Sequence, residues 1–392
     1  MNIPKDWKKK KLKSISTILF SNVDKKSFPE ETPVMLCNYM DVYNNEYITS
    51  KLNFMQATAK ETEIKKFKLY KDDVIITKDS ETQNDIAVPT VVAENIDNLI
   101  CGYHLAFIRP NKEKLNSIYL MKLLQEHSIK HEFIRLANGI TRFGLSTSTF
   151  KNLYIPLPPL PEQQKIAEIL STWDKAIETT TKLIQAKKTQ KKALMQSLMN
   201  DEFLIKKGGK KVKLGKIAEI NMGQSPSSIN YNENKKGSIL IQGNADIKNR
   251  KIKQRYWTTQ ITKECEVNDI ILTVRAPVGA VALSNYKACI GRGVCAIRMK
   301  EGKQNYLYHW LVFFENKWKK YEQGSTFTAI NSFDLKKLKL VIPPLEDQTR
   351  IAEILTTADK EIETLEKYLS KLQEQKKGLM QQLLTGKKRV VV

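Results

Sequence analysis

Several features that would restrict the class of this protein are missing from its 392 residues. No apolar run approaches the length needed to cross a bilayer, and the start of the chain carries no apolar secretory signal. The five cysteines are scattered and never spaced as C-x-x-C, which argues against a disulfide framework and against a zinc knuckle. We therefore expect a cytoplasmic protein with reduced cysteines and no contact with a membrane.

The sequence also lacks the short motifs of enzymes that modify or move along nucleic acids. It contains neither N-P-P-[FYW] nor D-P-P-[FYW], the tetrapeptides of adenine methyltransferases, and no G-x-x-x-x-G-K-[ST] nucleotide loop. His127 and His131 lie one helical turn apart, but no cysteine or carboxylate pattern completes a metal site. Gly291-Arg292-Gly293 lacks the strand-turn-helix setting of a cofactor loop. We expect no catalytic residue, no metal and no cofactor on this chain.

Acidic residues are too few to balance the basic ones. Against 42 Asp and Glu stand 65 Lys and Arg, which gives a formal net charge of +23. Such a field attracts polyanions, so the expected partner is nucleic acid, although a lysine-rich composition without a functional target is the alternative. The charge carries no information about which base sequence is bound.

An internal repeat organises the chain. Residues 158–199 align without a gap on residues 343–384, with about 23 of 42 positions identical. Each copy opens with two prolines and then runs for roughly 35 residues with almost no glycine or proline, which predicts a long helix entered through a proline-rich elbow.

Apolar residues in both copies recur at alternating steps of four and three, the pattern of a coiled-coil seam. The seam positions are Ile166, Leu170, Trp173 and Ile177 in the first copy and Ile351, Leu355, Ile362, Leu365 and Leu369 in the second. A helix on the order of 50 Å long must pack on another helix, and the other copy is the simplest partner, arranged antiparallel.

If the ends of the two antiparallel helices are aligned, Ile166 faces Leu383, and the residue numbers of any two facing positions add up to 549. Trp173 then faces Lys376 and Ala358 faces Lys191, so we expect the Lys376 stem along the indole and Lys191 directed to solvent. The alternative is that both lysines mark where the seam meets water or a partner helix.

The segments before the two helices share the order of their elements rather than their residues. Asp73-Val74-Ile75-Ile76-Thr77 corresponds to Asp269-Ile270-Ile271-Leu272-Thr273, and a helical stretch follows in each half, at 118–136 and 306–321. The expected fold class is α+β, with two mixed α/β domains in a pseudo-twofold arrangement, separated by two long antiparallel coiled-coil helices. The expected parts are the first domain (1–155), the first helix (156–200), a linker (201–211), the second domain (212–340), the second helix (341–385) and a basic tail (386–392).

The chain resembles the specificity subunits of Type I restriction-modification systems along nearly its whole length. The residues that carry the resemblance are Ile155 to Ile166, their echo Val341 to Gln348, the run Asp269 to Gly279, and Gly291-Arg292-Gly293. The resemblance implies that each domain is a target-recognition domain for half of a split site in double-stranded DNA. It also implies that the helices fix the spacing and bind two methyltransferase subunits, which two motor-nuclease subunits join in some systems. S-adenosylmethionine, ATP and Mg would then belong to those partner subunits.

Candidate base-contacting residues follow from side-chain chemistry, because Arg, Lys, Asn and Gln donors match base edges in the major groove. In the first domain the candidates are Lys78, Gln83, Asn84 and Arg142. In the second they are Gln242, Asn244, Arg275 and Arg292, with Lys251 and Arg255 in a basic run suited to phosphates. The alternative for each residue is that it holds a phosphate or packs a loop.

Two other functions compete with that of a specificity subunit. A self-sufficient nucleic-acid enzyme is disfavoured by the missing motifs. A coiled-coil DNA-binding regulator or scaffold without methyltransferase partners is disfavoured by the repeat, because two divergent domains on matching helices suit two half-sites served by equivalent assemblies.

Overall fold

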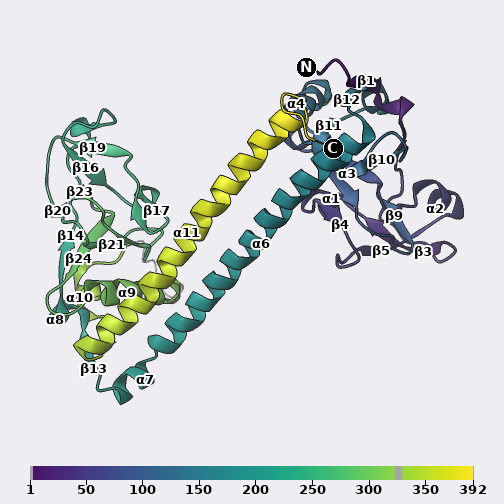
Figure 1. The fold of residues 1–392 in the computed structure, drawn as a ribbon. Helices are drawn as coiled ribbons and strands as arrows, with labels where there is room; N and C mark the ends of the chain where they lie inside the picture. The colour runs from purple at the N-terminus through teal and green to yellow at the C-terminus, as the bar shows by residue number, and fades with distance from the viewer. Residues whose placement is uncertain (1–2, 323–328, 392) are drawn as a thin grey trace. The chain divides into compact units, whose positions relative to one another are not determined.

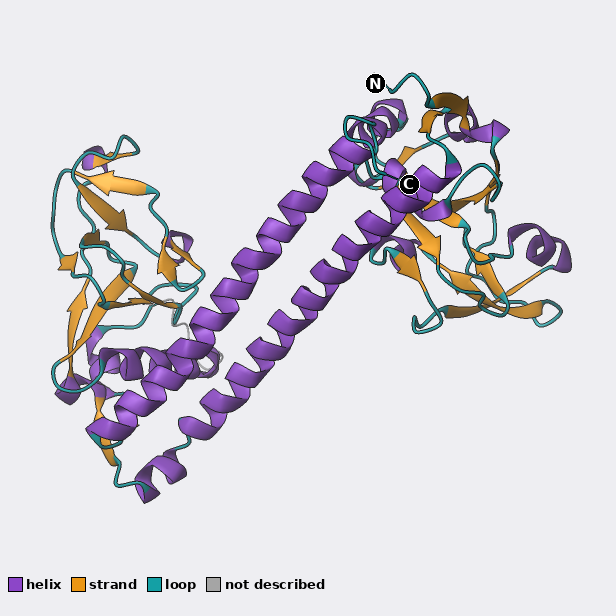
Figure 2. Cartoon of the chain, viewed as in Figure 1, coloured by secondary structure: helices purple, strands orange, loops and turns teal. Residues whose placement is uncertain are grey.

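The computed structural model describes residues 3–322 and 329–391, which form two compact units. Unit 1 comprises residues up to Thr180 and from Tyr368 onward, and unit 2 comprises Thr181–Lys367. Each unit contains one mixed α/β domain and part of two long helices, α6 (Leu160–Leu198) and α11 (Leu345–Leu383) (Figures 1 and 2). The α+β class, with two mixed domains and two long helices, is confirmed. None of the helices in the described ranges has the length and apolar content that a bilayer span requires.

The domain of unit 1 has a five-stranded and a three-stranded sheet. The strands of the larger sheet are, in spatial order, β2 (Ser16–Phe20), β10 (Leu105–Pro110), β6 (Val74–Thr77), β8 (Pro89–Val92) and β4 (Tyr47–Ile48). Those of the smaller sheet are β5 (Met55–Ala59), β3 (Thr32–Cys37) and β9 (Leu99–Cys101). Two strand pairs complete it, β1 (Lys8–Lys11) with β12 (Tyr154–Leu157) and β7 (Asp79–Ser80) with β11 (Phe143–Gly144). Its helices are α1 (Tyr39–Tyr43), α2 (Glu61–Phe67), α3 (Ser117–Leu124), α4 (His127–Leu136) and α5 (Thr147–Asn152), with short 3-10 turns η1 (Leu12–Ser14) and η2 (Gln83–Asp85).

The domain of unit 2 repeats this plan with a six-stranded and a five-stranded sheet. The first contains, in order, β14 (Ala218–Met222), β24 (Val294–Met299), β21 (Ile270–Thr273), β22 (Val281–Leu283), β18 (Lys251–Ile252) and β17 (Ile247–Lys248). The second contains β15 (Tyr231–Asn232), β19 (Tyr256–Thr258), β16 (Ser238–Ile241), β23 (Ala288–Ile290) and β20 (Glu264–Cys265). The pair β13 (Lys210–Lys213) with β25 (Lys339–Ile342) matches β1 with β12. The helices are α7 (Asp201–Lys206), α8 (Leu214–Ile217), α9 (Gln304–Glu322) and α10 (Ser332–Lys337), with 3-10 turns η3 (Ser228–Asn230) and η4 (Asn244–Asp246).

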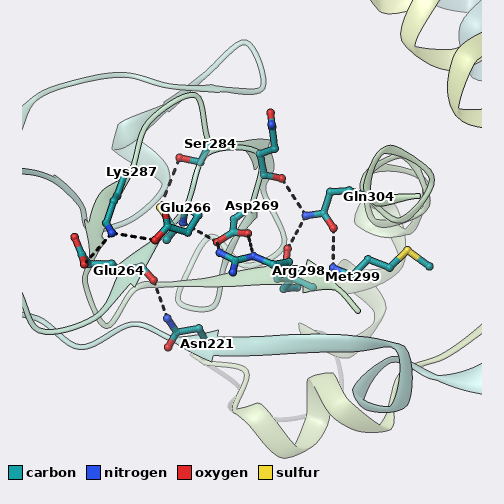
Figure 3. Close-up of polar contacts among 12 residues, drawn as sticks. Asn221, Glu264, Glu266, Asp269, Ser284, Lys287, Arg298, Met299 and Gln304 are labelled. Atoms are coloured by element: carbon teal, nitrogen blue, oxygen red, sulfur yellow. Dashed lines mark hydrogen bonds and ion pairs between the residues drawn. The ribbon is translucent and has the colours of Figure 1, made fainter. Parts of the chain in front are cut away.

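The apolar runs that the sequence pairs across the two halves form equivalent central strands. All residues of β6 and β21 are buried, and each strand follows a buried aspartate, Asp73 or Asp269. In unit 2 both oxygens of Asp269 accept from the Arg298 guanidinium, at 2.7 and 2.8 Å (Figure 3). Arg109 binds Asp73 in the same two-pronged way in unit 1. Hydrogen bonding to the carboxylate raises the pKa of Arg298 and stabilises the start of the strand.

Two segments differ from what the sequence predicts. The stretch at 118–136 consists of two helices, α3 and α4, that are separated at Gln125 and Glu126. The stretch expected as a linker, 201–211, contains α7 and the start of β13. In unit 1 the tail is also held, because the Arg389 guanidinium binds the carboxylates of Glu162 and Asp6.

A buried glutamine explains the repeated proline elbow before each long helix. The Gln163 side-chain amide donates to the Pro158 carbonyl, and its oxygen accepts from the Asn116 backbone N–H, both at 2.9 Å. Gln348 makes the same two contacts in unit 2, with the carbonyl of Pro343 and the N–H of Lys303. The motif P-P-L-x-x-Q therefore joins each helix to the loop that precedes α3 or α9.

The two helices run antiparallel within each unit. In unit 1 the start of α6 and the end of α11 enter one hydrophobic core, through Ile166 and Leu170 from α6 and Leu383 from α11. In unit 2 the end of α6 and the start of α11 do the same, through Met195 from α6 and Ile351 and Leu355 from α11.

Ion pairs confirm the predicted register to within one residue. Lys376 pairs with Asp174 in unit 1, and Lys191 pairs with Asp359 in unit 2, so facing positions sum to 550 rather than 549. The expected environments of the lysines were wrong, since their ammonium groups bind carboxylates rather than an indole face or open solvent. Both lysine side chains are largely buried, with exposed fractions of 16% and 15%.

Each ion pair has a third partner from the neighbouring domain. In unit 1 the Lys122 side chain of α3 is completely buried, and its ammonium lies 2.6 Å from Asp174 and 2.8 Å from Glu46. In unit 2 His309 of α9 holds the corresponding place, with Nδ1 at 3.9 Å from Asp359 and Nε2 at 3.0 Å from the Thr356 hydroxyl.

We expect Asp174→Asn to destabilise unit 1 by about 3–5 kcal/mol, because Lys122 and Lys376 would then share one carboxylate in a buried site. Chemical unfolding monitored by circular dichroism measures the loss. Lys165→Ala, which removes an exposed pair with Glu168 on α6, is the control and should cost about 1 kcal/mol or less. Equal effects of the two variants would contradict a structural role for the buried pair.

We expect unit 2 to become less stable as the pH is lowered, because of His309. Burial, together with the Lys191 ammonium, lowers the pKa of His309 to about 3, whereas the unfolded imidazole titrates near the ordinary value of about 6.5. Between these values the unfolded chain binds a proton that the folded chain does not, so the free energy of unfolding decreases as the pH falls.

Urea unfolding between pH 7 and pH 4.5 measures this dependence. His309→Gln should show a smaller loss of stability over that range than the wild type. Thr356→Ala removes the hydrogen bond but keeps the imidazole, so it should be less stable and retain the wild-type pH dependence. If the glutamine variant lost stability as steeply as the wild type, this role of His309 would be wrong.

Candidate nucleic-acid interface

A cleft of about 360 Å³ in unit 1 and one of about 580 Å³ in unit 2 lie at equivalent strand ends. In unit 2 the loops that follow β16 and β21 and the turn between β23 and β24 meet there. In unit 1 the loops that follow β3 and β6 and the turn between β9 and β10 meet. Both clefts therefore belong to the plan that the two domains share, while the loops that line them differ in sequence.

Four of the candidates predicted from the sequence, Gln242, Asn244, Arg275 and Arg292, converge on the cleft of unit 2. The described residues that line it are Ser225, Pro226, Ser228, Tyr231, Gln242, Gly243, Asn244, Arg275, Ala276, Arg292 and Gly293. The polar side chains among them are hydroxyls, amides and guanidinium groups, all of which can donate a hydrogen bond, and the described lining contains no carboxylate. The cleft can therefore donate to acceptor atoms of a ligand.

Close backbone packing fixes the loops of this cleft. A Cβ atom at Gly293 would lie 2.0 Å from the Gln242 carbonyl oxygen. Only glycine therefore fits where the β23–β24 turn meets the loop after β16. The backbone N–H of Arg292 donates to the Ser225 hydroxyl at 3.1 Å. Buried Asp246 accepts from the backbone N–H groups of Gln242, at 2.8 Å, and Gly243, at 3.2 Å. The positions of the polar side chains are thus set by the backbone beneath them.

The two basic-run candidates of unit 2 lie outside the lining of this cleft. The Lys251 ammonium pairs at 2.7 Å with Glu363 of α11, and the Arg255 guanidinium lies 3.4 Å from Asp246. Arg255 also lies over the Tyr256 ring, at 5.4 Å from its centroid. Their contact with phosphates stays a prediction.

The cleft of unit 1 has the opposite chemistry. It is lined by Tyr39, Met40, Tyr43, Asp79, Ser80, Glu81, Thr82, Asp85, His104 and Arg142. The Tyr39 and Tyr43 rings stack with centroids 5.7 Å apart, and the Asp85 charge raises the pKa of Tyr43. His104 Nδ1 lies 2.9 Å from Asp79. Acceptors and aromatic faces prevail here, where donors prevail in unit 2.

Of the four first-domain candidates, only Arg142 lines this cleft. The Lys78 ammonium donates to the Ser21 carbonyl at 2.7 Å, and burial lowers the pKa of this lysine. Gln83 donates to the Ile134 carbonyl at 2.9 Å, and Asn84 is exposed in η2. Sequence reasoning missed the tyrosines and carboxylates, although their place directly after β3 and β6 gave a signal, since Asn244 and Arg275 follow the equivalent strands.

The histidine pair considered as metal ligands lies on α4. The rings of His127 and His131 have centroids 6.3 Å apart. In the described ranges, no group of three or more His, Cys, Asp or Glu side chains is arranged to hold a metal ion.

Comparison with known proteins gives a consistent set of relatives. The family described as "Type I restriction modification DNA specificity domain" matches residues 4–188 and 206–374. The provisionally named type I restriction enzyme MjaX specificity subunit of Methanocaldococcus jannaschii is 31% identical, covering 99% of this chain and 95% of its own length. The MjaVIII specificity subunit of the same organism is 28% identical over 70% of this chain and 71% of its own length.

Solved structures share the fold at lower identity. The S subunit of a Type I restriction-modification system from M. genitalium is similar with a TM-score of 0.65 and 17% identity, covering 98% of this chain and 96% of that one. A chain from a study of assembly and conformational transition in a type I R-M system gives a TM-score of 0.58 at 21% identity, with coverage of 98% and 99%.

We expect Gly293→Ala to distort the cleft of unit 2, because the added methyl group would collide with the Gln242 backbone. Overpacking of this kind costs about 1–3 kcal/mol. Gly243→Ala is the matched control in the same cleft, since its Cβ would meet nothing within 4 Å. Thermal unfolding should show a lower midpoint for Gly293→Ala alone; equal midpoints would contradict the tight contact.

Proposed function

This chain belongs to the Type I restriction-modification DNA specificity family, and we propose that it recognises a bipartite target in double-stranded DNA on behalf of partner enzymes. The observation that carries the proposal is the pair of clefts at equivalent strand ends, one rich in donors and the other in acceptors. A repeated scaffold with two different linings suits two half-sites of different sequence.

Base contacts are assigned to the clefts and phosphate contacts to the surrounding lysines. Gln242, Asn244, Arg275 and Arg292 would contact base edges in one half-site, and Arg142 with the adjacent Gln83 and Asn84 would do so in the other. Lys251 and Arg255 would act on the backbone, as would Lys78 if it left the Ser21 carbonyl. The charge of +23 supports such binding through counterion release, which contributes affinity without sequence preference.

The proposed partners are two methyltransferase subunits, joined in some complexes by two motor-nuclease subunits. These would bind along α6 and α11. The predicted seam residues Ile166, Leu170, Trp173, Ile177, Ile351, Leu355, Ile362, Leu365 and Leu369 would hold the two helices together. S-adenosylmethionine, ATP and Mg would be bound by the partners, so that this chain supplies specificity and no catalytic residue. The complex would act in the cytoplasm.

We expect the purified chain alone to bind DNA weakly, with an affinity that falls steeply with salt, and to transfer no methyl group. Addition of its methyltransferase partner should produce adenine methylation at one motif made of two half-sites and an unread spacer. Methylation of a randomised plasmid library, mapped by single-molecule sequencing, measures both outcomes. Methyl transfer by the chain alone, or methylation without a motif, would overturn the proposal.

A further inference from the structure

Arginine is scarce in this basic chain, which makes its positions informative. Only ten of the 65 basic residues are arginine, and the rest are lysine. Lysine offers a flexible point charge that suits phosphates, whereas the planar arginine fork makes two parallel hydrogen bonds to the O6 and N7 atoms of guanine. Two of the ten arginines, Arg275 and Arg292, line the cleft of unit 2.

These two arginines differ from the arginines that support the fold. Five others bind carboxylates: Arg109 with Asp73, Arg250 with Glu315, Arg255 with Asp246, Arg298 with Asp269, and Arg389 with Glu162 and Asp6. Within the described part of the chain, no hydrogen bond or ion pair joins the guanidinium of Arg275 or Arg292 to another group. Both residues are exposed, and the described cleft lining has no acid to neutralise them. Their donors are therefore available to a ligand.

The backbone holds both arginines in place before any ligand binds. Arg292 stands between Gly291 and Gly293, and its N–H is bound by the Ser225 hydroxyl. The N–H of Gly291 donates to the Ile241 carbonyl at 2.8 Å, and the N–H of Val274, next to Arg275, donates to the Gly293 carbonyl at 2.9 Å. Fixed side-chain origins favour selection among bases, because the backbone of the loops needs no ordering when the contact forms.

The other polar groups of the cleft suit the edges of bases rather than a phosphate alone. Gln242 and Asn244 present both a donor and an acceptor, the pair that matches N7 and N6 of adenine. A phosphate has only acceptors, so the amide oxygens would be unused in a site built for phosphates. The cleft of about 580 Å³ therefore combines two guanidinium groups, which suit guanine, with two side-chain amides, which suit adenine.

We infer that Arg275 and Arg292 select guanine in the half-site recognised by the second domain. The inference rests on the proposed function and adds the identity of the base and of the residues that select it. In the equivalent cleft of unit 1, Asp79, Glu81 and Asp85 follow β6 as Arg275 follows β21, and His104 lies in the turn that corresponds to that of Arg292. Selection of guanine by paired arginines is accordingly confined to one half of the target.

The test uses the complete complex of this chain with its methyltransferase and maps the methylated motif on a randomised plasmid library. Arg275→Lys and Arg292→Lys keep the charge and remove the fork. Each variant should relax the preference at a G·C pair of the second half-site by roughly tenfold to a hundredfold, with the first half-site unchanged. Arg298→Lys is the matched control, because it makes the same substitution in the same domain at an arginine that binds Asp269, and it should keep the wild-type motif.

Three results would overturn the inference. A wild-type motif whose second half-site contains no G·C pair would do so. So would lysine variants that methylate less at every site but keep the motif, since that is the behaviour of phosphate contacts. If the wild-type complex methylated DNA without any motif, the proposed function would fail together with the inference. A wild-type motif combined with either of the first two results would overturn the inference alone.

Discussion

The rest of the structure depends on one ion pair that occurs twice. Lys376 and Asp174 join the two helices in unit 1, and the repeat-equivalent residues Lys191 and Asp359 join them in unit 2. Each residue is displaced by 185 positions from its counterpart, so one sequence repeat produces both contacts through antiparallel pairing. A buried ion pair adds little to stability compared with apolar packing, but the loss of one partner is costly. The pair therefore acts mainly on register, which it restricts because a shifted helix would leave buried lysines without carboxylates.

The two domains place different residues beside this repeated ion pair. Lys122 brings a further positive charge to Asp174 in unit 1, and Glu46 compensates it, whereas neutral His309 adjoins Asp359 in unit 2. Both residues come from the helix that follows the central sheet, and both lie beside the same repeated aspartate, Lys122 at 2.6 Å and His309 at 3.9 Å. The two helices stay alike in sequence because each supplies the ion-pair partners of the other. Each domain needs to supply only one residue that is compatible with the ion pair. This freedom allows the cleft loops to diverge without loss of the scaffold.

Regular periodicity explains which parts of the molecule are predictable from sequence. The repeat, the proline elbows, the two long helices and the central strands β6 and β21 follow from local patterns. The register was right to within one residue, yet the partners of Lys376 and Lys191 were not found, because the aspartates lie beside the apolar seam and not in it. The arginine and amide side chains that meet in the cleft of unit 2 were named as candidates because they follow recognisable strands, and their contact with bases stays a prediction. The cleft of unit 1 was not predicted in this way, because Lys78 turns inward and the tyrosines and carboxylates that replace it were not considered as base contacts.

Lysine and arginine differ in what each can accomplish on DNA. A net charge of +23, mostly from lysine, supplies an attraction that is the same for every sequence and that is weakened by salt. Selectivity has to come from groups whose geometry is fixed and whose partners differ between base pairs. Under the proposed function, those groups would be the arginines and amides of the cleft in unit 2, and the carboxylates, tyrosines and single arginine of the cleft in unit 1. The two linings differ in hydrogen-bonding character at the same point of the same fold, so under the proposed function a change in target sequence would require new loops and would leave the helices unaltered.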